Sequence, residues 1–243
     1  MGGRNVANWR PLCAIRFPYA FVNGTQPSWL GGNLVLNENN MIPDSVEIIK
    51  ELGKGKSGIS YLAKYMNSEV IFKEMHNEIV SYYKFEKPKI ELELAAYEVL
   101  KKQNINIPEL LEYDEHNGYL IKEYIEGNTI TESIIKSKLS DDIMLLALKW
   151  EEVLKNEDIN IDYYPSNFVL KNDELYYIDY EYNKYSDEWN FRNWGLYYWL
   201  NGNGFKSFLE TMDSRFINYE GTGIPIKNGE LYKERERILK MVI

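Results

Sequence analysis

The regular patterning of the chain begins just after Met41, and its first part is typical of strands. Residues 46–52 form a short apolar segment, residues 59–63 resume a strand-like pattern, and the glycine-rich stretch 53–58 separates them. Strand, glycine loop and strand together predict a β-hairpin. Residues 70–73 predict a third strand, which ends on a lysine.

The next segment predicts a helix followed by two strands. Pro88 suits the first turn of a helix, and apolar residues follow it at helical spacing through residues 90–104. Residues 110–113 and 119–122 flank a His-Asn-Gly turn signal at 116–118 and predict two further strands. We therefore expect a small five-stranded antiparallel sheet with one helix.

The second half of the chain is expected to be mainly helical. Residues 140–154 begin with a serine that can cap a helix and continue with an apolar stripe at helical spacing. Residues 168–170 and 175–178 predict two brief strands joined by a turn. That arrangement would put Asn167 and Asp179 at neighbouring strand ends. The fold class is therefore α+β.

The first forty residues differ from the rest. They are rich in Gly, Asn, Trp and Pro and have no sustained period of 2.0 or 3.6 residues. We expect residues 1–40 to be an N-terminal appendage, with Met41 as a hypothetical natural start. Deleting 1–40 would then leave a folded and active domain.

Composition narrows the chemistry. The chain has 243 residues, and its single cysteine, Cys13, excludes a thiolate metal cluster. Its two histidines, His76 and His116, leave little material for a histidine-based triad. The net charge of -9 argues against broad nucleic-acid binding. No apolar run approaches the ~20 residues that span a bilayer. We expect a cytoplasmic protein with no membrane or direct nucleic-acid partner.

The most informative motif lies in the second half. Asp162 and Asn167 stand five residues apart, and Asp179 follows twelve residues after the asparagine. This is the spacing of a kinase catalytic loop and its metal-binding aspartate. Asp162 would accept the proton of a hydroxyl group, while Asn167 and Asp179 would hold magnesium, which prefers oxygen ligands. Taken alone, each of these residues has an alternative role as an ordinary cap or turn residue, but their joint order with the glycine hairpin, the strand lysine and the helix glutamate favours the kinase-like interpretation.

The first half of the chain contains candidate nucleotide-binding residues. The stretch 53–58 fits G-x-G-x-x-G, which also occurs in dinucleotide-binding folds and plain turns, but here an extended segment follows it rather than a helix. Lys73 could bind phosphates or be a solubility lysine of an edge strand. Glu93 is its preferred partner because it lies in the middle of the predicted helix; Glu91 and Glu98 are alternatives.

Taken together, residues 46–200 resemble the protein-kinase-like superfamily, and Ile178-Asp179-Tyr180-Glu181-Tyr182 is similar to the I-D-x-E-Y segment of choline kinases and aminoglycoside phosphotransferases. The resemblance implies a bilobal fold, with an N-lobe over 41–125 and a compact C-lobe over 126–243, and ATP and Mg as cofactors. It implies the following roles: phosphate binding by Gly53, Gly55, Ser57, Gly58 and Lys73, with Glu93 as partner of the lysine; adenine binding by a hinge at Glu123, Tyr124 and Ile125; catalysis by Asp162; and metal binding by Asn167 and Asp179.

Three departures from the family pattern bear on activity. Asn160 stands where a histidine usually precedes the catalytic aspartate, and Asn193 stands where small-molecule kinases place an aspartate that braces the catalytic loop. No A-P-E motif follows Asp179. These departures leave open a slow enzyme or a nucleotide-binding pseudokinase.

The acceptor has two candidate classes. The short stretch between Ile125 and Asp162 resembles compact RIO and KEOPS-type kinases, which favours a protein serine or threonine hydroxyl. The many aromatic and acidic residues after Asp162 favour a small cationic substrate, because aromatic rings attract organic cations. The same rings could instead pack the core, as the helical spacing of residues 194, 197 and 198 indicates.

Overall fold

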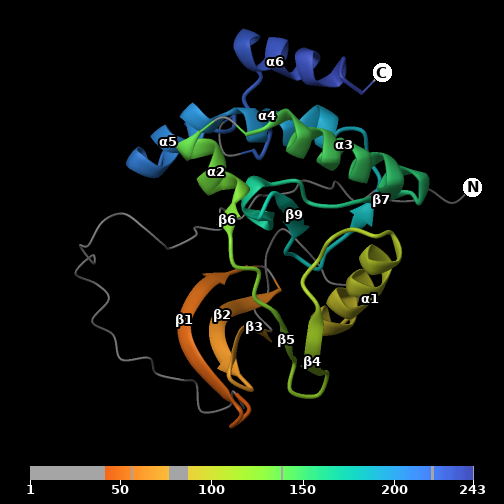
Figure 1. Cartoon of the computed structure of the whole chain (residues 1–243), viewed down its shortest axis with the longest axis vertical. Helices are drawn as coiled ribbons and strands as arrows, with labels where there is room; N and C mark the ends of the chain where they lie inside the picture. Colours follow the sequence, from red (N-terminus) through yellow and green to blue (C-terminus); the bar gives the residue numbers. More distant parts are fainter. Residues whose placement is uncertain (1–41, 56, 77–86, 138, 220–221, 243) are drawn as a thin grey trace, which may run out of the picture. The chain divides into compact units, whose positions relative to one another are not determined.

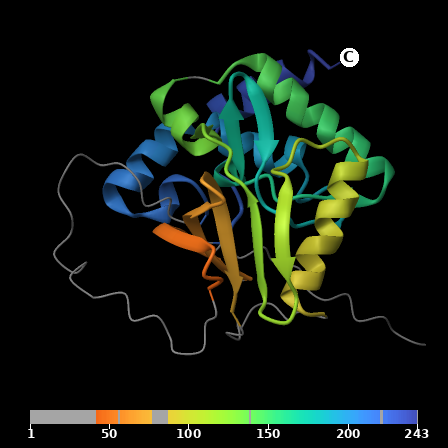
Figure 2. The ribbon, with the colours of Figure 1, turned by 60° about the horizontal axis from the view of Figure 1, so that its bottom comes forward.

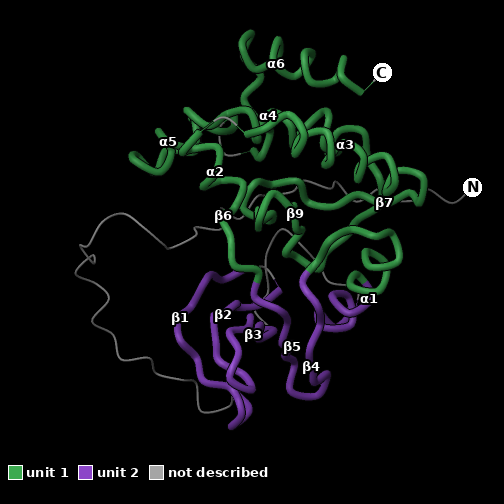
Figure 3. The backbone as a smooth tube through the Cα atoms, in the orientation of Figure 1, with its two compact units in different colours: residues 1–14, 96–107, 125–243 green, residues 15–95, 108–124 purple. Residues whose placement is uncertain are grey.

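The structure is a computed structural model that describes residues 42–55, 57–76, 87–137, 139–219 and 222–242; the appendage expected at 1–40 lies outside them. The chain divides into two compact units, shown in Figure 3. Unit 2 contains the described residues up to 95 together with 108–124. Unit 1 contains 96–107 and the described residues from 125 onwards. The fold class is α+β, as predicted.

Unit 2 is built on one antiparallel sheet of five strands in the order β1-β2-β3-β5-β4 (Figure 1). The strands are β1 Val46–Lys54, β2 Gly58–Tyr65, β3 Ser68–Met75, β4 Leu110–Asp114 and β5 Tyr119–Glu123. The five strands predicted from the sequence are all present. In this order β3 is the central strand and is paired on both sides, with β2 and with β5.

Alternating side chains of these strands form the core of unit 2. Val70 and Phe72 on β3 pack with Ala63 on β2 and Ile121 on β5, and all four are at most 1% exposed. The helix α1, Lys89–Lys102, follows the sheet strands β1 to β3, and its residues up to Ala95 belong to unit 2. On β3 and β5 the neighbouring residues Lys73 and Lys122 are buried as well, so these two strands are covered on both sides.

Unit 1 is mainly helical. Its helices are the end of α1, then α2 Ile130–Lys136, α3 Asp141–Asn156, α4 Leu196–Leu200, α5 Gly202–Thr211 and α6 Gly229–Leu239. Its strands are short and form two small sheets: β6 Asn128–Thr129 with β8 Phe168–Lys171 and β9 Glu174–Tyr177, and β7 Ile159–Asn160 with β10 Asn183–Lys184. A π-helix at Phe191–Gly195 leads directly into α4.

The strands β8 and β9, the pair of teal arrows in Figure 2, form a hairpin whose open end lies beside two residues of the candidate site. Its two turn residues, Asn172 and Asp173, both have positive φ (52° and 64°), which suits a tight hairpin turn and these residue types. Phe168 pairs with Tyr177 at the open end. Asn167 and Asp179 therefore flank the open end of one hairpin.

Aromatic side chains dominate the core of unit 1. Tyr163 is fully buried, its ring stacks on Phe168 at 6.1 Å, and Trp199 meets Phe168 edge-on at 5.0 Å. Of the rings that could have bound a cation, most are buried: Tyr163, Tyr164, Tyr180, Trp194, Tyr197, Tyr198 and Trp199. These seven rings therefore pack in the core, and the ring of Tyr197 also faces the cations of Lys227 and Arg235 at 5.1 and 5.6 Å. Tyr182 is exposed, and Tyr185 and Trp189 are half-buried.

No helix in the described part of the chain is both long enough and apolar enough to cross a membrane.

Candidate active site

Lys73 and Glu93 form a buried ion pair in unit 2. The ammonium group of Lys73 donates to Oε1 of Glu93, and the two side chains are 3% and 6% exposed. Lys73 lies within the central strand β3, two residues before its end, so it is neither the last residue of a strand nor on an edge strand. The interpretation as an edge-strand solubility lysine is therefore wrong. The alternative partners Glu91 and Glu98 are exposed.

The glycine hairpin lies next to this pair. Gly53 belongs to β1, Gly58 begins β2, and the amide of Gly55 donates to the carbonyl oxygen of Gly58 (2.8 Å). A Cβ atom on Gly58 would lie 2.2 Å from the carbonyl oxygen of Glu74, so glycine is required here by the neighbouring strand. Ser57 is 8% exposed, and its hydroxyl donates to Glu93.

The residues expected to bind adenine follow the sheet. Glu123 ends β5, where its amide donates to the carbonyl oxygen of Glu109 (2.8 Å), and it pairs with Val70 of β3. Glu123 and Tyr124 are half-buried, and Ile125 is 4% exposed. Glu123 and Tyr124 group with unit 2 and Ile125 with unit 1.

In unit 1 a short 3-10 turn at Pro165–Asn167 shapes the loop that carries Asp162 and Asn167. Oδ1 of Asp162 accepts from the amide of Tyr164 (3.1 Å), so this aspartate also organises its own loop, as a turn residue would. The side-chain nitrogen of Asn167, Nδ2, donates to the backbone carbonyl oxygen of Asp162 (3.2 Å). That bond fixes the orientation of the Asn167 amide group, and its oxygen is then the atom available as a ligand.

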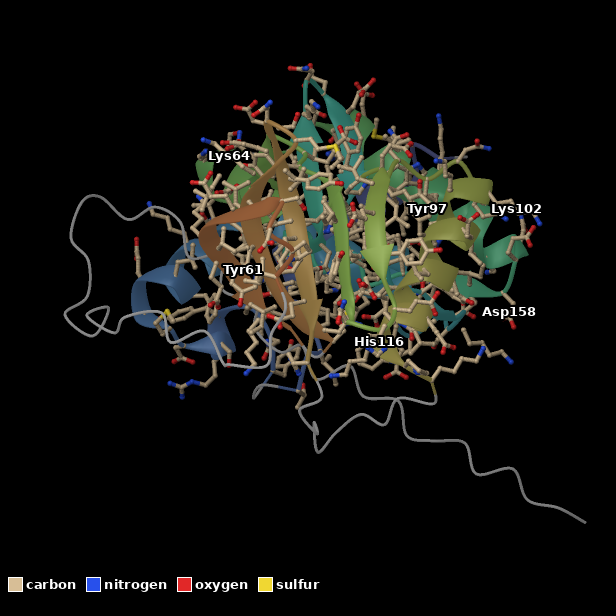
Figure 4. The ribbon with its side chains drawn as sticks, turned by 90° about the horizontal axis from the view of Figure 1, so that it is seen from below. Tyr61, Lys64, Tyr97, Lys102, His116 and Asp158 are labelled. Atoms are coloured by element: carbon tan, nitrogen blue, oxygen red, sulfur yellow. The ribbon has the colours of Figure 1, made fainter. Side chains whose placement is uncertain are left out.

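Asp179 is tied to the same loop through the backbone. The amide of Ile178 donates to the carbonyl oxygen of Asn167 (2.9 Å), which places Asp179 one residue beyond that bond. Asp179 is 5% exposed, and the next residue, Tyr180, packs its ring 5.3 Å from that of Tyr97, which is labelled on α1 in Figure 4. The structure thus brings Asp162, Asn167 and Asp179 onto one loop-and-hairpin unit.

Tyr177 lies near the carboxylates of this region, and no pattern in the sequence singled it out. Its hydroxyl donates to the carbonyl oxygen of Glu181 (3.0 Å). Burial raises the pKa of Tyr177 well above its ordinary value, and the nearby charges of Asp179, Glu181 and Asp162 raise it further. The carboxylates of Asp179, Glu181 and Asp162 therefore lie close enough to Tyr177 to act on its buried hydroxyl.

Asn167 and Asp179 have the side-chain chemistry of ligands for a hard cation. Asn167 and Asp179 supply an amide oxygen and a carboxylate, the ligand types of magnesium, which is usually held by one or two carboxylates together with water and phosphate oxygens. Among the described residues there is no group of three or more His, Cys, Asp and Glu that could hold a metal ion.

The loop that carries Asp162 is held by hydrogen bonds from several other segments of unit 1. Nδ2 of Asn160 donates to the carbonyl oxygen of Trp189 (2.9 Å), and Asn193 donates to Asp187 and accepts from Arg235 (both 2.9 Å). The loop itself is held by Trp199, whose indole N–H donates to the carbonyl oxygen of Tyr163 (2.9 Å).

Gly195 allows the end of the π-helix to approach this loop closely. A Cβ atom on Gly195 would lie 2.5 Å from Cβ of Tyr163 and 2.8 Å from the ring of Phe191. The sequence shows a glycine beside a tryptophan here, but only the fold reveals that the glycine faces the loop of Asp162.

No protein-family model matches the chain, and no curated protein matches its sequence.

Proposed function

We propose that this protein is an ATP- and magnesium-dependent phosphotransferase of the protein-kinase-like superfamily that transfers a γ-phosphoryl group to a hydroxyl. The observation that carries the proposal is the buried Lys73–Glu93 pair on the central strand of unit 2. A lysine held inside a sheet by one carboxylate is costly to bury and does not serve solubility. Phosphate binding gives its ammonium group a use.

The residues of unit 1 support the same proposal. Asp162 is half-buried, and bonds to Tyr164 and Asn167 order its loop. In the proposed reaction its carboxylate would accept the hydroxyl proton. Asn167 and Asp179 would hold the metal ion. When bound, Mg-ATP supplies the phosphoryl group and the charge neutralisation that the transfer needs. The protein's part is orientation, proton acceptance and the fixed charge of Lys73.

For the acceptor, a protein serine or threonine is the first candidate, because α2 and α3 leave a compact connection between Ile125 and Asp162. The burial of seven aromatic rings in the core of unit 1 removes most of the support for a cationic small molecule. Tyr182, Tyr185 and Trp189 remain at least partly exposed just after Asp179, beside the exposed Asp187 and Glu188. This segment favours a small hydroxyl-bearing cation as the second candidate.

Two isosteric substitutions test the assignment. Asp162→Asn removes the proton acceptor and is expected to lower turnover by about 10²- to 10⁴-fold, while the Kd for ATP with magnesium changes less than about twofold. Asp179→Asn removes a metal ligand and is expected to weaken that binding by about tenfold or more. Calorimetric titration with ATP and magnesium measures the binding, and phosphate transfer to amino alcohols, aminoglycosides or generic protein substrates measures turnover.

Asp173→Asn is the matched control, because Asp173 is exposed in the turn of the β8–β9 hairpin and asparagine tolerates its positive φ. It should behave as wild type. Equal binding losses in Asp162→Asn and Asp179→Asn would reject the assigned roles. ATP binding by a wild-type protein whose turnover matches that of Asp162→Asn would indicate a pseudokinase, and absence of ATP binding would reject the proposal.

A further inference from the structure

The tip of the glycine hairpin is tied to other elements of unit 2. The hydroxyl of Ser57 donates to Oε1 of Glu93 on α1 (2.8 Å), and the carbonyl oxygen of Ser57 accepts from the amide of His76 (3.3 Å), the residue after β3. Nε2 of His76 contacts the carbonyl oxygen of Gly55 at 2.9 Å. The hairpin is therefore held both from the end of the central strand and from the helix.

The contact of His76 has a definite direction. Nζ of Lys89 lies 3.4 Å from Nδ1 of His76 and also donates to the carbonyl oxygen of that residue. A carbonyl oxygen can only accept, so Nε2 of His76 carries the hydrogen that is donated to Gly55. The bond from Lys89 to the carbonyl oxygen of His76 holds the backbone at this position.

The contact of Ser57 is more unusual because it shares an acceptor with Lys73. Oε1 of Glu93 accepts from both residues, whereas Oε2 is buried and has no hydrogen-bond partner in the part of the chain that the structure describes. A hydrogen bond to a buried carboxylate is stronger than one between neutral groups. The position of the hairpin is thus linked to the carboxylate that also orients Lys73.

We propose that Ser57 is a positioning residue that latches the glycine hairpin to α1 through Glu93. The latch holds the hairpin in one position before any nucleotide arrives, and so reduces the ordering cost of binding. Only the consequence for ATP rests on the proposed function; the latch itself is a property of the free protein.

Amide hydrogen exchange in the full chain without nucleotide tests the latch directly. The reporter is the amide of Gly55, which donates to Gly58 across the base of the hairpin tip. Ser57→Ala is expected to speed exchange of this amide by about tenfold or more, because a hydrogen bond to a charged acceptor is lost and the tip opens locally. Exchange of the Phe72 amide in β3 should change less than about twofold. If Ser57 only supplied a hydrogen bond to Glu93 and did not hold the hairpin, Ser57→Ala would change the exchange rates of the Gly55 and Phe72 amides by the same factor.

Two further variants make the comparison specific. Ser68→Ala is the same substitution at an exposed position of the same sheet, at the start of β3, and should leave the Gly55 amide unchanged. Ser57→Thr keeps a hydroxyl and should restore slow exchange. If Ser57→Ala leaves exchange of the Gly55 amide within about twofold of wild type, the latch is rejected whatever the activity.

Steady-state kinetics then connect the latch to the proposed reaction. Ser57→Ala should raise the KM for ATP by about three- to tenfold with kcat changed less than about twofold, because the hairpin binds nucleotide without taking part in proton transfer. Faster exchange together with an unchanged KM would show that the hairpin does not contact ATP and would remove this role. Faster exchange in a protein that never binds ATP would leave the latch standing and reject the proposed function.

Discussion

Lys73 and Glu93 form a buried ion pair, and the burial of the two charges has a free-energy cost. Taking each ion out of water costs several kcal/mol, and the attraction between them offsets this only while both are present. Ser57 adds a hydrogen bond to the same carboxylate oxygen, which lowers the cost further. A buried pair of this kind contributes little net stability compared with well-packed apolar side chains, so its presence is better explained by the chemistry of the ammonium group.

This reasoning gives a prediction for stability. Lys73→Met should destabilise the protein by about 3–5 kcal/mol, because it leaves the carboxylate of Glu93 buried without its cation. The double variant Lys73→Met with Glu93→Leu should recover most of that loss, to within about 1–2 kcal/mol of wild type, since Ser57 then loses its acceptor. Urea unfolding followed by circular dichroism measures both. Similar stability losses in the single and double variants would contradict the burial argument.

At the residue scale, the sequence anticipated the pair but not its surroundings. The helical spacing around Glu93 and the strand ending near Lys73 were sufficient to nominate both residues. The bond from Ser57 to Glu93 joins residues far apart in the chain, and a loop hydroxyl has many possible local partners. The hydrogen bonds of Tyr177 to Glu181 and of Trp199 to Tyr163 were missed for the same reason, because they depend on the folded hairpin and helix.

Among the elements, those with a sustained hydrophobic period were predicted well. The five strands of unit 2, α1, α3 and the β8–β9 hairpin all lie close to their expected positions. The helix α2 was missed because its seven residues are too few to establish a period. Thr129 and Glu132 form a capping box at its start, and this T-x-x-E signal is present in the sequence.

The π-helix had no such signal. Its Phe-Arg-Asn-Trp-Gly sequence, residues 191–195, could continue an ordinary α-helix. Close packing explains the unusual turn: Gly195 lies against Tyr163, and the amide and guanidinium group of Arg192 donate to the buried carboxylate of Glu151 (2.8 and 2.6 Å). Tertiary contacts, rather than local propensity, therefore determine the geometry of this element.

Gly195 offers the sharpest prediction for this element. Gly195→Ala would place a methyl group against the fixed rings of Tyr163 and Phe191, and we expect a loss of about 1–3 kcal/mol in stability. Gly229→Ala is the matched control, because nothing lies within 4 Å of its Cβ position at the start of α6. It should be neutral or stabilising by about 0.4–1 kcal/mol. Thermal melts of the two variants measure the difference, and equal melting temperatures would contradict the close approach.

For the molecule as a whole, the tyrosine content determines the response to alkaline pH. The chain contains 20 tyrosines, and several are buried or face carboxylates. Burial, then the hydrogen bond to Glu112, raises the pKa of Tyr119 from 10.0 to about 12. Burial also raises the pKa values of Tyr163 and Tyr177 well above their ordinary values. The folded protein therefore holds protons that the unfolded chain releases near pH 10.

That difference predicts the pH range in which stability falls. The stability that protonated Tyr119 contributes is complete below about pH 10, where both states hold the proton. Between pH 10 and about 12 the unfolded state binds fewer protons than the folded state, so the free energy of unfolding decreases as the pH rises. Urea unfolding at pH values across this range measures the loss. Tyr119→Phe removes the ionisable hydroxyl and should reduce this loss of stability, because one group whose pKa differs between the folded and unfolded states is gone.

Tyr232→Phe is the control, since that ring is 54% exposed on α6 and the substitution is chemically the same. The stability of the Tyr232→Phe variant should fall with rising pH as steeply as that of wild type. Ultraviolet absorbance of tyrosinate provides a second readout: the buried tyrosines should ionise in a steep step that coincides with the loss of circular dichroism, after the exposed ones have titrated. Equal slopes for Tyr119→Phe and Tyr232→Phe would mean that the environment of Tyr119 does not hold its proton, and that the alkaline loss arises from the more deeply buried Tyr163 and Tyr177.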